Sequence, residues 1–130
     1  MKKLLLLFFI LFTTITFAQT IERVEPPFWW TGMHNTELQL LIYGKNIAET
    51  EVSLSKYSAV KIVAVNKVKN PNYLFIDLKI GEKAQAGTFT INFQKADKTI
   101  TTYDYTLNKR RENSANRQGF QPSDVMYLIT

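Results

Sequence analysis

The chain has 130 residues, a formal net charge of +5 and no cysteine. This length supports one domain of ordinary size with a single core. The lack of cysteine excludes a disulfide framework and a lipidated cysteine, and the small net charge does not indicate a polyanion as partner.

The first eighteen residues have the three parts of a secretory signal peptide. Lys2 and Lys3 precede an uncharged apolar run, Leu4–Phe12, and the segment ends at Ala18. We therefore predict that residues 1–18 are a signal peptide, cleaved after Ala18, and that the protein is exported to the periplasm or secreted. A transmembrane anchor is the competing interpretation, but a helix needs about 20 apolar residues to cross a bilayer. We expect no membrane contact after cleavage, which lowers the net charge to +3 because Lys2 and Lys3 are removed.

Short runs of β-branched and aromatic residues follow, separated by turn residues, which is the pattern of strands. The connections are too short for the helices of a βαβ fold. We predict an all-β, Ig-like β-sandwich over residues 19–107. Its seven expected strands are Ile21–Val24, Leu38–Tyr43, Val52–Leu54, Val60–Val68, Tyr73–Ile80, Thr88–Phe93 and Thr99–Leu107.

Alternation within these runs indicates which faces are buried. Tyr73–Ile80 places its leucines and isoleucines on one face. Neither face of Val60–Val68 is uniformly polar, which predicts a register shift partway along, at a bulge. Tyr103 and Tyr105 share a face, and we interpret them as part of a cross-strand aromatic ladder in preference to a sugar platform.

After Leu107 the composition changes. Residues 108–123 are mostly polar and charged, and we predict a linker with a turn or two of helix at Arg111–Arg117. Its basic residues are interrupted by Glu112 and have no interleaved aromatics, so a solvated linker is favoured over a nucleic-acid site. These basic residues are Lys109, Arg110, Arg111 and Arg117.

Residues 124–130 form a nearly continuous apolar run, as in a strand buried on both faces of a parallel sheet. Such a strand is not stable without partners. We therefore expect a second domain to start here and the sequence to be truncated at its beginning.

Three segments carry a resemblance to a known family. Val24–Ile47 contains a Pro-rich start, paired tryptophans and a Gly-Met step, Val68–Ile80 resembles a mid-domain hairpin, and Arg110–Thr130 resembles a domain junction. Together they resemble the N-terminal domain of bacterial cyclomaltodextrinases, neopullulanases and related α-amylase-family glycoside hydrolases. The resemblance implies a non-catalytic accessory domain of a secreted or periplasmic hydrolase of starch, maltodextrin or cyclodextrin. Residues 124–130 would then begin the first strand of its (β/α)8 barrel.

The resemblance also implies what this chain lacks. The catalytic nucleophile, general acid and third carboxylate of the family lie on later barrel strands, so the resemblance implies no catalytic residue, metal ligand or cofactor here and no enzyme activity of this chain alone. Calcium, where the parent enzyme binds it, would be held by the barrel. Asp77, Glu82 and Asp97 show no convergence and are interpreted as solvated charges, because catalytic carboxylates need a cleft. His34 is the only histidine and is interpreted as a polar turn residue, because a metal site needs several ligands.

Trp29 and Trp30 are the leading candidates for a contact site, for carbohydrate or for another domain. Adjacent strand residues point to opposite faces, so at most one of the two rings fills the core. The other packs on the barrel, closes the edge of the sandwich or touches glucan, and Phe28 and Met33 would extend its patch.

The partners expected from the resemblance are the catalytic barrel of the same polypeptide, α-glucan and a second copy in a homodimer. Nucleic acid is not expected. Two hypotheses from other classes are a stand-alone carbohydrate-binding module and an Ig-like adhesion domain.

Overall fold

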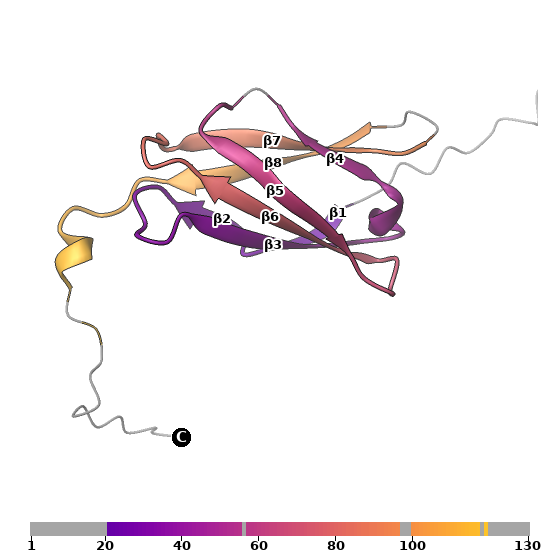
Figure 1. Ribbon diagram of the computed structural model, residues 1–130, viewed down its shortest axis with the longest axis horizontal. Helices are drawn as coiled ribbons and strands as arrows, with labels where there is room; N and C mark the ends of the chain where they lie inside the picture. Colours follow the sequence, from indigo (N-terminus) through magenta and orange to yellow (C-terminus); the bar gives the residue numbers. More distant parts are fainter. Residues whose placement is uncertain (1–20, 56, 97–99, 118, 120–130) are drawn as a thin grey trace, which may run out of the picture.

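The computed structural model describes residues 21–55, 57–96, 100–117 and 119, which form a sandwich of two four-stranded sheets (Figure 1). Sheet A has the order β1 (Ile21–Glu25), β3 (Glu37–Gly44), β6 (Tyr73–Ile80), β5 (Val60–Lys67). Sheet B has the order β2 (Phe28–Trp30), β8 (Ile100–Asn108), β7 (Gly87–Gln94), β4 (Glu51–Leu54). Two short 3₁₀ helices complete the fold, η1 (Ile47–Glu49) and η2 (Ser114–Asn116). In this part of the chain, no helix combines the length and apolar character needed to cross a membrane.

The prediction of an all-β sandwich is confirmed, and each expected run contains a strand. The predicted number of strands, seven, was too low by one, because β2 was not expected as a strand. β2 has only three residues, follows Pro26 and Pro27, and pairs in parallel with β8, far away in sequence. Such a short strand depends on its distant partner and leaves little periodicity to detect. The predicted signal peptide (1–18) and the predicted barrel strand (124–130) lie outside the described residues.

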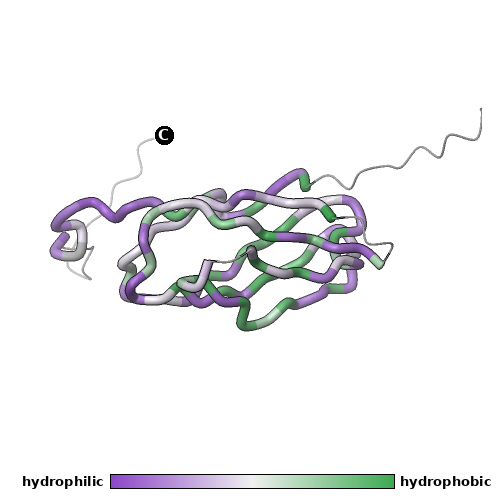
Figure 2. The backbone as a smooth tube through the Cα atoms, turned by 90° about the horizontal axis from the view of Figure 1, so that it is seen from above, coloured by the Kyte–Doolittle hydropathy of each residue, from purple (hydrophilic) through white to green (hydrophobic). Residues whose placement is uncertain are grey.

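The core lies between the sheets and comes from alternate residues of the strands. Hydrophobic and hydrophilic residues alternate along the strands, and the segment after β8 is mainly hydrophilic (Figure 2). Tyr105 packs against its cross-strand partner Phe89 with tilted rings, whose centroids are 5.5 Å apart, so the expected aromatic pairing across the strands is present at Tyr105 and lies inside the sandwich. The side chains buried most completely are Leu40, Ile42, Ile47, Thr50, Leu74, Ile76, Leu78, Ile91, Phe93, Tyr105 and Leu107.

The register shift predicted in β5 occurs at Val63. Ile62 faces Leu78 and Ala64 faces Asp77, so Val63 has no partner of its own in the ladder. The extra residue changes the phase of the strand, so that Val65 as well as Ile62 packs against the core. Val63 is left 65% exposed. The bulge therefore explains why neither face of this run looks polar in the sequence.

Ile76 and Val63 provide a matched test of this packing. Ile76 is fully buried, so Ile76→Ala should lower the free energy of unfolding by about 2–5 kcal/mol, through lost burial and a cavity. Val63→Ala should change it by no more than about 0.5 kcal/mol. Urea unfolding followed by tryptophan fluorescence measures both. Equal losses in the two variants would show that the inward and outward faces of sheet A are assigned incorrectly.

Candidate interaction site at the β2 edge

The site is built on β2, where the chain crosses from sheet A to sheet B. β1 ends at Glu25, the peptide bond to Pro26 is cis, and β2 starts at Phe28. Phe28, Trp29 and Trp30 pair with Thr106, Leu107 and Asn108 of β8. The amide of Thr31 extends this ladder by donating to the carbonyl of Asn108 at 3.0 Å. β8 therefore fixes which way each aromatic side chain points.

The two tryptophans lie on opposite faces, as their adjacency predicts. Trp29 packs against the core, where its indole Nε1 is buried without a hydrogen-bond partner. Phe28 and Trp30 point outward and are 42% and 37% exposed. Their rings meet edge to face, with centroids 5.3 Å apart and planes at 83°. Of the candidate residues, Phe28 and Trp30 thus form an exposed aromatic pair, and Trp29 belongs to the interior.

The loop between β2 and β3, residues 31–36 and hereafter the β2 loop, brings Met33 to this aromatic pair. Gly32 has a φ of +71°, a conformation that favours glycine, and the loop returns to sheet A at β3. The Asn35 side chain accepts a hydrogen bond from the amide of Glu37 at 3.0 Å, and the amide of Ile80 donates to the carbonyl of Thr36 at 2.8 Å. These bonds fix the far end of the loop to β3 and β6.

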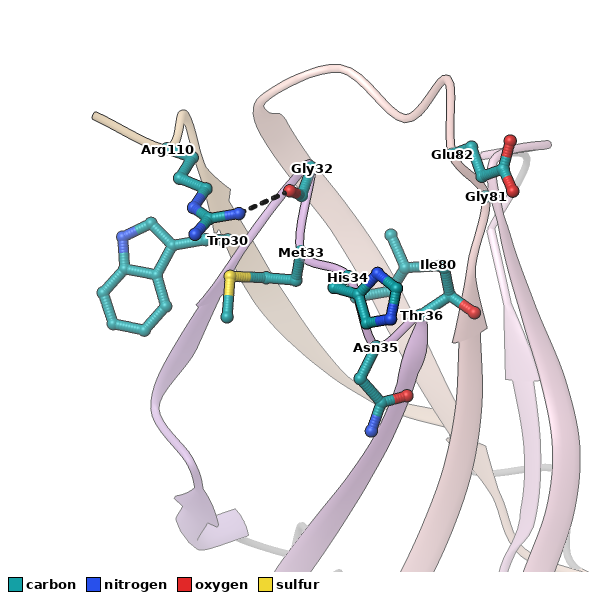
Figure 3. Close-up of a pocket in the computed structure, with 10 residues that line it drawn as sticks. All are labelled: Trp30, Gly32, Met33, His34, Asn35, Thr36, Ile80, Gly81, Glu82 and Arg110. Carbon is teal, nitrogen blue, oxygen red and sulfur yellow. Dashed lines mark hydrogen bonds between the residues drawn. The ribbon is translucent and has the colours of Figure 1, made fainter. Parts of the chain in front are cut away.

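Between the loop and the ends of β2 and β6 lies a groove of about 440 Å³ (Figure 3). The thioether of Met33 extends toward the ring of Trp30, and His34 lies further along the loop. The groove is lined by Trp30, Gly32, Met33, His34, Asn35, Thr36, Ile80, Gly81, Glu82 and Arg110.

Arg110 is the residue of this site that sequence reasoning missed. Its Nη1 donates to the carbonyl of Gly32 at 3.0 Å, and the residue is partly buried. The segment 108–123 was interpreted as a solvated linker because of its composition, but the structure places Arg110 against the β2 loop. Its presence in one of the three resembling segments was the only sequence signal, and that signal did not specify a contact.

The comparison with known families decides what this sandwich is. Residues 23–111, well over half of the chain, match the family described as Cyclomaltodextrinase, N-terminal. The chain belongs to the cyclomaltodextrinase N-terminal domain family. The resemblance found in the sequence is thereby confirmed.

A search of solved structures finds a weaker likeness. The BIgI domain of beta protein from S. agalactiae, solved bound to CEACAM1, matches 72% of this chain and 99% of its own length. The sequence identity is 14% and the TM-score is 0.37. The family assignment therefore rests on the sequence match.

Two of the three carboxylates interpreted as solvated charges, Asp77 and Glu82, lie in the described part of this cyclomaltodextrinase N-terminal domain. Asp77 accepts hydrogen bonds of 2.7 Å from the side-chain amides of Gln39 and Asn66 on the outer face of sheet A. Glu82 lines the groove, and Asp97 lies outside the described residues. Within the described ranges, no group of three or more His, Cys, Asp or Glu side chains could hold a metal ion. His34 is exposed in the β2 loop.

Among the titratable groups in the described part of the chain, Tyr105 in the core has a marked pKa shift. Burial raises its pKa well above the ordinary value of 10.0, and the neighbouring Tyr103 adds to the effect. The Tyr105 hydroxyl is buried without a hydrogen-bond partner. This shift reflects a phenol enclosed between two sheets and does not mark a reactive site.

Tyr105 should make the domain sensitive to alkali. Its pKa is raised in the folded state, so its contribution to stability is complete below the ordinary pKa of 10.0 and is lost as the pH rises beyond that value. Tyr105→Phe removes an unpartnered hydroxyl and should raise the free energy of unfolding at neutral pH by about 1 kcal/mol. The variant should also lose less stability than the parent chain at alkaline pH. Unfolding in urea at a series of pH values measures both effects, and Tyr73→Phe, on the outer face of sheet A, is the control. An identical alkaline loss in the parent chain and Tyr105→Phe would contradict the assignment.

Proposed function

We propose that this domain is exported and packs on the catalytic barrel of an α-glucan hydrolase through the Phe28, Trp30 and Met33 surface. The observation that supports this most directly is the contrast on the outer face of sheet B. The centre of that face presents polar side chains, including Thr90, whose hydroxyl donates to Asp104 at 2.7 Å, and the exposed Ile100 lies at the start of β8, at the end of that strand away from β2. At β2 it presents two large exposed rings. Exposed apolar groups of this kind usually mark an interface.

The ring geometry favours a protein partner over a glucan chain. Sugars stack on flat aromatic faces, and a platform for several sugar units needs rings in similar planes. Phe28 and Trp30 lie nearly perpendicular, so the two rings do not form one flat platform. The edges and faces of perpendicular rings fit the irregular relief of a protein surface, with Met33 as an adaptable neighbour.

Family membership supports the rest of the proposal. A cyclomaltodextrinase N-terminal domain accompanies a catalytic part, and residues 124–130 have the apolar profile of a first barrel strand. Residues 1–18 provide the export signal. We include in the proposal a role in shaping the substrate site or in dimerisation of the whole enzyme.

The purified chain should neither hydrolyse nor strongly bind α-glucan. Incubation with maltodextrin or pullulan should release no reducing sugar above a blank, since the resemblance implies that the catalytic carboxylates of the family lie on later barrel strands. Titration with maltoheptaose should leave tryptophan fluorescence unchanged. A saturable fluorescence change that Trp30→Ala abolishes and Tyr73→Ala preserves would instead favour a carbohydrate-binding module.

The interface itself is tested in the longer polypeptide, obtained by extending the reading frame beyond Thr130 into the proposed barrel. Phe28→Ala and Trp30→Ala together should increase the rate of tryptic cleavage at Lys109, Arg110 and Arg111 several-fold, because the domain should separate from the barrel more often. Thr88→Ala with Thr102→Ala, on the polar part of the same face, is the matched control. Cleavage rates that are equal in all three proteins would contradict packing through β2.

A further inference from the structure

A second pocket lies next to the groove, and its charge is not explained by packing on a barrel. It has a volume of about 370 Å³ and is lined by Trp30, Met33, Arg110, Arg111, Ser114 and Arg117. Three of its six lining residues are arginines, and none is acidic. This pocket is hereafter the arginine pocket.

A local reversal of the chain brings these arginines together. After β8 the amide of Ser114 donates to the carbonyl of Arg111 at 3.2 Å, and the amide of Asn116 donates to the carbonyl of Asn113 at 3.1 Å. Asn113 takes a left-handed conformation, with a φ of 58°, and η2 follows directly. Arg111 and Arg117 therefore line the same pocket as Arg110, although polar segments of this kind usually remain extended in solvent.

The positive charge in the pocket is not neutralised within the described residues. The ion pair found in the described part of the chain joins Arg23 and Glu25 on β1, away from the pocket. Arg110 donates its hydrogen bond to a backbone carbonyl, which carries no net charge. Three positively charged side chains that line one space repel one another. A bound anion would relieve this repulsion.

We propose that the arginine pocket binds a phosphate group. A phosphate carries close to two negative charges at neutral pH and has three strong acceptor oxygens. Guanidinium groups match these oxygens in bidentate geometry. Trp30 and Met33 form an apolar wall, which suits a phosphate monoester with an organic substituent. The proposal does not depend on packing against a barrel, because every lining residue belongs to this chain.

Tryptophan NMR signals of the full chain provide a direct test. The chain has two tryptophans, so its indole N–H region should contain two signals, which Trp30→Phe assigns. Addition of inorganic phosphate should change the chemical shift of the Trp30 signal until it reaches a plateau. The chemical shift of Trp29, which packs on the core, should stay the same. Sodium chloride at matched ionic strength and sodium acetate are the controls. Movement of the same size with chloride or acetate would overturn the proposal.

Variants locate the site and identify the source of the phosphate. Arg117→Ala should raise the dissociation constant for inorganic phosphate by about tenfold, since it removes a charged hydrogen bond. Arg23→Ala removes one positive charge from β1, away from the pocket, and should change this dissociation constant little. Binding to Arg117→Ala with parent affinity would refute the site. Phenyl phosphate distinguishes the sources, because tighter binding than inorganic phosphate identifies a monoester as the ligand, and equal binding identifies the free anion.

Discussion

The parallel pairing of β2 with β8 is the contact on which the candidate site depends. It covers only three residues, yet it fixes the position of Phe28, Trp29 and Trp30 against the last strand of the sandwich. Because side chains alternate along a strand, the pairing directs Trp29 inward and the other two rings outward. The same pairing holds the β2 loop beside the chain that leaves β8, so that Arg110 reaches the carbonyl of Gly32. A shift of one residue would reverse all of these positions.

The rest of the sandwich provides the rigid support for this edge. The inner faces of the two sheets supply one continuous core, and the bulge at Val63 lets β5 contribute to it on both sides of a change in register. The outer face of sheet B is polar at its centre, with an exposed Ile100 at the start of β8, and Asp77 and its two amide partners occupy the outer face of sheet A. The exposed aromatic pair, which packs beside the other end of β8, therefore stands out against this polar centre, which is the physical basis for proposing an interface there.

Two kinds of contact meet at the end of the domain. The Phe28, Trp30 and Met33 surface offers apolar area, which suits a neighbouring domain, and the arginine pocket offers charge and hydrogen-bond donors, which suit a phosphate. Trp30 and Met33 belong to both. Occupation of the pocket would thus alter the surroundings of the residues proposed to meet the barrel, and an anion could influence how firmly the domain is held.

The sequence by itself determined the strand runs, the inward face of β6, the irregularity of β5 and the family, because each depends on local periodicity or on a contiguous motif. It also showed that Trp29 and Trp30 point to opposite sides, though not which of them is buried. Only the tertiary structure decided that, since the answer depends on pairing with a strand more than seventy residues away. The tertiary structure also showed that β2 is a strand, where Arg110 lies, and that three arginines line one pocket. From composition alone these arginines were interpreted as solvated, because the number of charges in a segment does not show which turns bring those charges together.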